Sequence, residues 1–280
     1  MNFWETACNL APWSWAQYDF MRVALLGVLV MAPLFALLGC IVVNHRLAFF
    51  SEAVGHAALT GIAIGVVAGL ANPLGAMLLF AALLALATTL LRRWSAASSD
   101  TIIGLLMASV VALGVVLLSR GGGFAKYTRY LVGDILTLTY ADVGGLALLL
   151  LVVLAGWIRG YNRLFMVGVC RTLARSRGIS PDATEAVFTM LVALAVTVSL
   201  QWVGLLVINA MLLLPAATAR NLARSASAYV GVAIVVALIS GVTGLLLSYY
   251  VNTAAGATMA LVATGLYALS LVFRRAPAGG

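Results

Sequence analysis

Long apolar runs separated by short polar breaks constrain this chain more than any other feature. Each run is close to the roughly 20 residues that an α-helix needs to cross the hydrocarbon core of a bilayer. The sequence therefore predicts an all-α fold, a polytopic bundle of eight or nine transmembrane helices, with the count left open by a tight break near Gln201. The runs cover residues 21–43, 47–70, 73–91, 100–119, 141–158, 183–200, 202–218, 228–249 and 254–273.

The composition supports an integral membrane protein. Hydrophobic residues make up 64% of the 280 and charged residues only 9%, whereas a soluble domain carries roughly 25% charged residues. The net charge of +8 therefore reflects membrane topology, and no nucleic-acid partner is expected. Cys8, Cys40 and Cys170 are scattered and form neither a disulfide framework nor a zinc-binding motif.

The distribution of basic residues predicts the orientation. With nine spans and an outside N-terminus, twelve of the sixteen Lys and Arg residues face the cytoplasm, as the positive-inside rule requires. These twelve are Arg46, Arg92, Arg93, Arg159, Arg163, Arg171, Arg175, Arg177, Arg220, Arg224, Arg274 and Arg275.

The two ends of the chain flank the spans. Residues 1–20 contain several Trp and Tyr residues and are predicted to form an N-terminal interfacial segment. They lack a basic start and a small-residue cleavage site, so no removable signal peptide is expected. Residues 276–280 form a short C-terminal tail.

The one long cytoplasmic connection lies between Arg159 and Glu185. Residues 164–177 can form a short helix with apolar residues on one side and arginines on the other, with Gly178 as its C-cap. Such a helix could lie on anionic membrane lipid or dock a cytoplasmic protein, and composition leaves both interpretations open. The chain has no GxxxxGK[ST] motif, so it does not bind ATP through a P-loop.

Glu52 and His56 are the most informative polar residues within the apolar runs. They are four residues apart, so a helix places them on one face. Ionisable groups in hydrocarbon cost several kcal/mol, and for this reason they usually line a pathway or pair with each other. Carboxylate oxygen and imidazole nitrogen are common ligands of divalent transition metals. A hydrogen-bonded pair that fixes helix register is the alternative.

Other polar residues carry weaker signals. Asp100 begins a run after a Ser-rich loop, where an N-terminal cap or helix-dipole partner is favoured over a role in a metal path. Asp134 follows the Gly-rich turn 121–123 and lies either in a broken helix that lines a cavity or in a surface loop. Asn209 and Pro215 are interpreted as packing residues.

Four segments together resemble the permease subunits of ABC importers for zinc, manganese and iron. Residues 44–61, NHRLAFFSEAVGHAALTG, are similar to the family's Arg-Met-Ala-x-x-x-Asp-Ala-x-x-His-x-x-Leu-x-Gly segment. Residues 99–104, SDTIIG, resemble its Asp-Thr-x-x-Gly start of a span, and residues 130–136, YLVGDIL, its Phe-Gly-Asp-Leu-Leu. The most specific segment joins VGLLV at 203–207 to PAATAR at 215–220.

The resemblance spans 21–275 and implies a transmembrane domain of a homodimeric type II importer in the bacterial cytoplasmic (inner) membrane. Two cytoplasmic ATPase subunits would drive it, so this chain would not itself be an enzyme, and an extracytoplasmic metal-binding protein would deliver the ion. The metal would be a substrate, and no tightly bound cofactor is implied. Segment 164–178 becomes the coupling helix, with contacts expected from Leu164, Cys170, Leu173, Ala174, Arg177 and Gly178. The metal path is assigned to Glu52 and His56, with Asp100 and Asp134 as secondary ligands.

The chain departs from the family pattern in three places. Glu52 stands where the family usually has Asp, which keeps the ligand atoms on a longer arm. The second His of many zinc-type members is absent from 106–109, and the turn 252–256 lacks the family's carboxylate and proline. Zinc is the favoured cargo, with manganese or iron as alternatives. A proton-coupled secondary transporter using Glu52, His56 and Asp134 is a less favoured reading, and an intramembrane metalloprotease lacks its HExxH motif.

Overall fold

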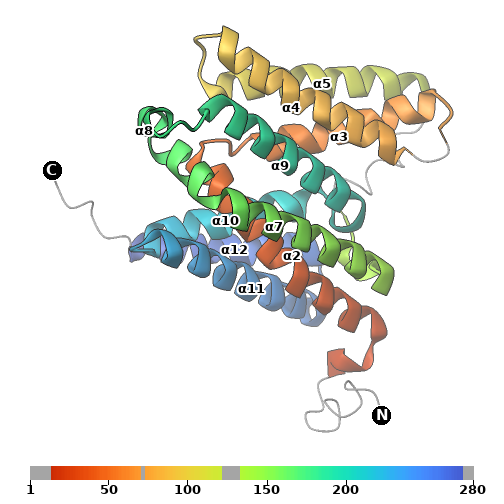
Figure 1. Cartoon of the computed structure of the whole chain (residues 1–280). Helices are drawn as coiled ribbons and strands as arrows, with labels where there is room; N and C mark the ends of the chain where they lie inside the picture. Colours follow the sequence, from red (N-terminus) through yellow and green to blue (C-terminus); the bar gives the residue numbers. More distant parts are fainter. Residues whose placement is uncertain (1–13, 71–72, 122–132, 274–280) are drawn as a thin grey trace.

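The computed structural model describes residues 14–70, 73–121 and 133–273 and shows a bundle of long α-helices (Figure 1). Within these ranges, nine helices are long and apolar enough to cross a membrane, which confirms the higher of the two predicted counts. The long helices are α2 (Asp19–Asn44), α3 (Phe50–Val67), α4 (Leu74–Trp94), α5 (Ser99–Gly121), α7 (Tyr140–Val169), α9 (Pro181–Val203), α10 (Leu205–Leu222), α11 (Ala226–Val251) and α12 (Ala255–Val272). Three short helices lie between or before them: η1 (Ser14–Gln17), η2 (Ile135–Thr137) and α8 (Arg171–Ser176).

Parts of the chain singled out by the sequence lie outside these ranges. They are the first thirteen residues of the predicted interfacial segment, most of the Gly-rich turn, the start of the 130–136 motif and the predicted tail. What the sequence predicts for these segments therefore stays a prediction.

Helix α2 is the centre of the bundle. It packs against α7, α10 and α11, and side chains such as Met31, Leu34 and Phe35 are fully buried. A helix that is apolar on all sides is expected in such a position. The nearly uninterrupted hydrophobic sequence of 21–43 is therefore explained by burial within the protein as well as by the membrane.

The remaining helices form two groups on either side of this centre (Figure 1). Helices α3, α4 and α5 pack on one another, and α9 connects them to the rest through its contacts with α4 and α7. Helices α11 and α12 pack together against α2 and α10. Helix α8 and the described C-terminal end lie at one end of the bundle and η1 at the other (Figure 1), as the predicted topology requires.

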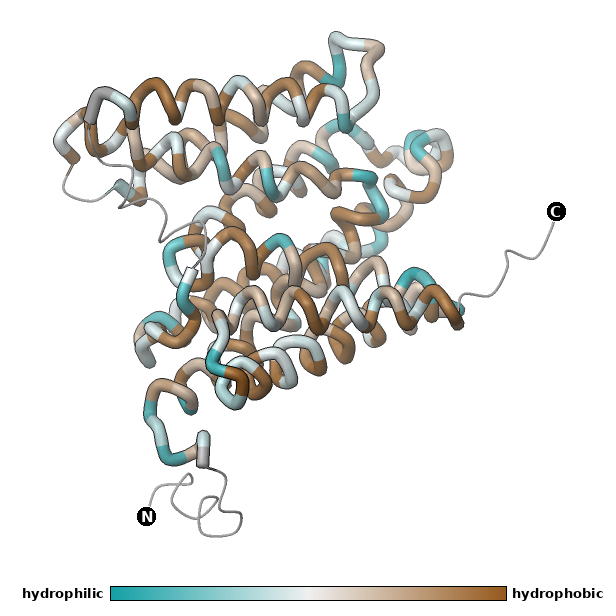
Figure 2. Tube along the Cα trace, turned by 180° about the vertical axis from the view of Figure 1, so that it is seen from behind, coloured by the Kyte–Doolittle hydropathy of each residue, from teal (hydrophilic) through white to brown (hydrophobic). Residues whose placement is uncertain are grey.

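Hydrophobic residues run along the helix bodies, and hydrophilic residues gather mostly at turns and helix ends (Figure 2). Large apolar side chains such as Leu79, Leu148, Ile158 and Leu261 are more than 60% exposed on the outer surface. In a soluble protein such a surface would aggregate. Here it is the surface that lipid or a neighbouring subunit covers.

Glycines allow two of the helix pairs to approach closely. A Cβ atom added to Gly39 of α2 would overlap the backbone carbonyl oxygen of Leu212 in α10, and one added to Gly244 of α11 would overlap the backbone of Met259 in α12. Small residues at such crossings are typical of membrane helices, where close packing replaces the hydrophobic driving force.

We expect Gly39→Ala to destabilise the protein by about 1–3 kcal/mol, because the added methyl group meets rigid backbone and forces α2 and α10 apart. Thermal unfolding of the purified protein in detergent measures the effect. The matched control is Gly231→Ala in α11, where an added Cβ meets nothing within 4 Å. Equal melting temperatures for the two variants would show that the α2–α10 contact is not tight.

Candidate metal path and cytoplasmic coupling segment

Glu52 and His56 lie in the first two turns of α3, on the same face, as the sequence predicts. Among residues 50–65, every position is buried except Glu52, His56 and Ile64, which are partly exposed. Over residues 50–65, the two ionisable side chains therefore lie on the one stripe that the described part of the chain leaves open.

The other faces of α3 are covered by neighbouring helices. It packs closely against α4 and α5 and also contacts α9 and α10. The hydroxyl of Thr60 donates to the backbone oxygen of Val110 in α5 at 2.9 Å and lies 3.1 Å from that of His56. These contacts fix the rotation of α3 about its axis, and with it the direction of the open stripe.

No hydrogen bond or ion pair joins Glu52 or His56 to another side chain in the described part of the chain. The alternative of a buried, hydrogen-bonded pair does not fit this arrangement. Two partly exposed ligand groups that have no side-chain partner among the described residues are available to an ion or to a second subunit.

The structure does not bring Asp100 and Asp134 to this pair. Asp100 is exposed in the first turn of α5, as a helix-dipole partner would be, while Ser98 provides the cap by accepting from the backbone N–H of Thr101 at 3.2 Å. Asp134 is exposed and accepts from the backbone N–H of Leu136 at 3.1 Å, capping η2. The described residues contain no group of three or more His, Cys, Asp or Glu side chains suited to holding a metal. A metal role for either aspartate stays a prediction.

Asp134 nevertheless lines a polar cavity of about 300 Å³, together with Asp142 and Gln201. Sequence reasoning did not single out Asp142, which accepts from both the backbone N–H and the hydroxyl of Thr139 in the capping box of α7. The sequence did contain a signal for this capping box: a Thr is followed three residues later by an Asp, just before an apolar run.

The coupling segment differs from the single helix predicted for 164–177. Residues 164–169 are the last turns of α7, Cys170 is extended (φ −151°, ψ 106°), and only the six residues of α8 follow. Two residues before the break, a Cβ on Gly168 would overlap the side chain of Asn44. The end of α7 is therefore pressed against the end of α2, and the chain turns away after it.

Gly178 ends α8 as predicted. Its φ is +74°, its N–H donates to the carbonyl of Arg175, and the N–H of Ile179 donates to that of Ala174, which is the Schellman pattern. Of the six residues expected to contact an ATPase, four are exposed and two, Leu164 and Ala174, are buried within this chain. The exposed four are Cys170, Leu173, Arg177 and Gly178.

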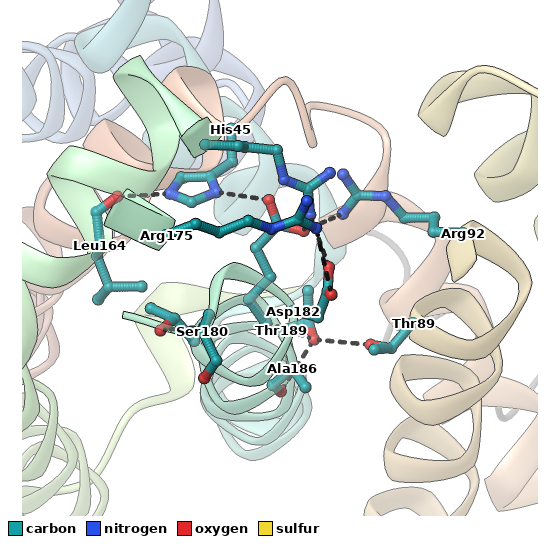
Figure 3. A network of polar contacts seen from close by, with 12 residues as sticks. His45, Thr89, Arg92, Leu164, Arg175, Ser180, Asp182, Ala186 and Thr189 are labelled. Atoms are coloured by element: carbon teal, nitrogen blue, oxygen red, sulfur yellow. Dashed lines mark hydrogen bonds and ion pairs between the residues drawn. The ribbon is translucent and has the colours of Figure 1, made fainter. Parts of the chain in front are cut away.

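Beside α8 lies a polar network that the sequence did not predict (Figure 3). Its centre is Glu185 in the second turn of α9, which forms ion pairs with His45, Arg92 and Arg171. The signal in the sequence was an ionisable residue inside the predicted span 183–200. The partners could not be identified because they come from distant parts of the chain.

Comparison with known proteins bears on the fold and the family of the chain. The family model described as "ABC 3 transport family" matches residues 17–274. The chain belongs to the ABC 3 transport family. Its fold is shared by PsaBC from Streptococcus pneumoniae, solved in complex with Fab, with a TM-score of 0.79, 25% identity and coverage of 96% of this chain and 94% of that one.

Two curated relatives of this ABC 3 family member match along nearly their whole length. The high-affinity zinc uptake system membrane protein ZnuB of Haemophilus influenzae is 33% identical, over 92% of this chain and 99% of the relative. The manganese transport system membrane protein MntC of Listeria monocytogenes is 27% identical, over 92% and 91%.

We expect Gly178→Ala to loosen the end of α8, because an alanine in the left-handed region costs about 1–2 kcal/mol. Amide hydrogen exchange of residues 173–179 should then be several-fold faster, while exchange in α2 stays unchanged. Gly178→Asn should have a smaller effect, because Asn tolerates this conformation. Wild-type protection in the Ala variant would mean that the cap does not hold α8.

Proposed function

We propose that this chain is the membrane permease subunit of an ATP-driven importer for a divalent transition metal, with Zn²⁺ as the favoured cargo. The observation that carries the proposal is the placement of Glu52 and His56 on the stripe of α3 that the described residues leave open between positions 50 and 65. The name of the ZnuB relative supports zinc. Full-length similarity to that relative makes a shared role in a multi-subunit transporter the simplest interpretation.

The two side chains offer one oxygen and one nitrogen ligand type, and zinc binds about four ligands of this kind. One chain supplies half of such a site. Two copies related by a twofold axis, with their α3 stripes facing each other, would supply two carboxylates and two imidazoles. A homodimer with the pore between the subunits therefore satisfies the chemistry of the ion and covers the exposed pair at the same time. Weak binding by few ligands also suits a path that has to release its ion.

The energy for transport would come from a partner, because the sequence has no P-loop. In this proposal two cytoplasmic ATPase subunits bind at α8, where Leu173 and Arg177 are exposed. Binding of ATP would move α8 and switch the pore between outward and inward access. An extracytoplasmic metal-binding protein would deliver the ion at the opposite face, and membrane lipid would surround the apolar outer surface.

Manganese is the second candidate, because the MntC relative is also similar along nearly its whole length. Ligand chemistry separates the two metals: imidazole suits zinc, whereas Mn²⁺ prefers carboxylate and other oxygen ligands. His56 therefore favours zinc, and its replacement should change the preference between the two ions.

We expect Glu52→Gln to lower zinc uptake by about 10–100-fold, because the amide keeps the shape of the side chain but loses the charge that binds the metal. Glu52→Asp, which restores the residue usual in the family, should keep most of the uptake. The measurement is ⁶⁵Zn uptake into proteoliposomes that contain the chain assembled with its ATPase and binding protein. Retained uptake in a variant with both Glu52→Ala and His56→Ala, at normal assembly, would rule out the pair.

The competing mechanism predicts a different result in a simpler system. A proton-coupled secondary carrier would move metal in liposomes that contain this chain alone, driven by a proton gradient. We expect no such uptake without ATP and the ATPase subunits. Gradient-driven uptake by the chain alone would overturn the proposal.

A further inference from the structure

Glu185 is a carboxylate in a helix that is otherwise apolar enough to cross a membrane. It lies in the second turn of α9, and only 10% of its side chain is exposed. A carboxylate removed from water needs close partners, and removal of one partner from such a buried pair is strongly destabilising. The position of Glu185 is therefore tied to the groups that surround it.

Three other segments provide those groups (Figure 3). Oε2 of Glu185 lies 2.8 Å from Nη2 of Arg171 in α8 and 3.2 Å from Nη1 of Arg92 in α4. Oε1 lies 3.4 Å from Nδ1 of His45, in the turn between α2 and α3. A single carboxylate thus joins α9 to the coupling segment, to α4 and to the α2–α3 turn.

The His45 end of this network is held on both sides. Its side chain is fully buried, and Nε2–H donates to the backbone oxygen of Leu164 near the end of α7 at 2.9 Å. Nδ1 faces Oε1 of Glu185 at 3.4 Å and has no hydrogen-bond partner among the described residues. Three basic side chains therefore surround the carboxylate.

Asp182, one turn earlier in α9, forms an outer layer. It lies 3.2 Å from Arg171 and 3.9 Å from Arg175, and 37% of its side chain is exposed. Arg171 therefore contacts two carboxylates of α9 at once. Only four residues connect the end of α8 to the start of α9, so α8 is held both by the chain and by these ion pairs.

We propose that Glu185 is a positioning residue that makes α8, α4, the start of α9 and the α2–α3 turn move as one unit during the transport cycle. The inference rests on the proposed function, in which an ATPase acts on α8. If α8 moved alone, Arg171 would move away and the buried carboxylate of Glu185 would lose one of its hydrogen-bond donors. A joint movement keeps every contact. The α2–α3 turn is only five residues long, so its displacement reaches the start of α3, where Glu52 lies.

A cross-link tests the joint movement directly. Arg93 in α4 and Arg175 in α8 line the same cavity of about 260 Å³, and neither contacts Glu185. Both are changed to Cys in a background without Cys8 and Cys170, and a flexible bis-maleimide long enough to span the cavity is added to the complete transporter. We expect ATP hydrolysis to stay within about twofold of the same variant before bridging, which is less than a typical coupling effect. A loss of about tenfold or more would show that α8 and α4 must separate, and would overturn the inference.

Paired substitutions test the role of the ion pairs. We expect Arg92→Gln to lower the number of metal ions imported per ATP hydrolysed by about fivefold or more, the range of a coupling free energy. Arg93→Gln, the adjacent residue with no ion pair among the described residues, is the matched control and should keep the wild-type ratio. Glu185→Asp keeps the charge and should preserve more of the ratio of metal imported to ATP hydrolysed than Glu185→Gln does. If Glu185 only stabilised the fold, two such variants with equal melting temperatures would have equal ratios.

A double variant completes the test. If Arg171 acts through Glu185, Arg171→Gln combined with Glu185→Gln should lower the ratio no further than Glu185→Gln alone. The inference would be overturned if the double variant lowered the ratio by the product of the two single effects. Equal ratios for Arg92→Gln and Arg93→Gln would also overturn it. Either result would leave the proposed function intact. A chain that binds no ATPase would overturn both, and retained uptake after loss of Glu52 and His56 would overturn only their metal role.

Discussion

A charged side chain inside a membrane-spanning helix has to find its partners in protein, water or a bound ion, because hydrocarbon offers none. Two glutamates of this chain meet the constraint in opposite ways. Glu185 is almost fully buried and is surrounded by three basic groups of its own chain. Glu52 also lies in the first turns of its helix, yet it is partly exposed and has no ion pair among the described residues. The first glutamate is satisfied by basic groups of its own chain, whereas the described residues offer the second no ion pair.

The packing of the bundle creates this difference. Helix α3 is covered on most of its circumference by α4, α5, α9 and α10, and the Thr60–Val110 hydrogen bond holds it against α5. What remains open is a stripe that begins with Glu52 and His56. Because every other residue between 50 and 63 is buried, rotation of α3 that would hide the pair would expose apolar contacts instead. The open pair is thus a consequence of how the whole group α3–α5 packs.

The sequence was sufficient for the features that depend on local composition. Apolar runs long enough to cross a bilayer predicted eight of the nine spans to within four residues at each end, whereas α7 continues to Val169, eleven residues past the predicted end at 158. The i, i+4 spacing placed Glu52 and His56 on one face. The sequence did not predict features that depend on contacts between distant residues. The helix predicted for 164–177 is broken at Cys170, just after Gly168 packs against Asn44, more than a hundred residues earlier in the chain. The partners of Glu185 come from 45, 92 and 171, and no periodicity in the sequence connects those positions.

The basic side chains around Glu185 also differ in how exposed they are, and exposure bears on how easily each contact can be broken. The side chain of His45 is completely buried, that of Arg92 is 15% exposed, and that of Arg171 is 49% exposed. Contacts in water are weak and are easily exchanged, whereas those in the interior are costly to break. The exposed end of the network therefore lies on α8, and its buried end lies at the α2–α3 turn, next to the helix that carries Glu52 and His56.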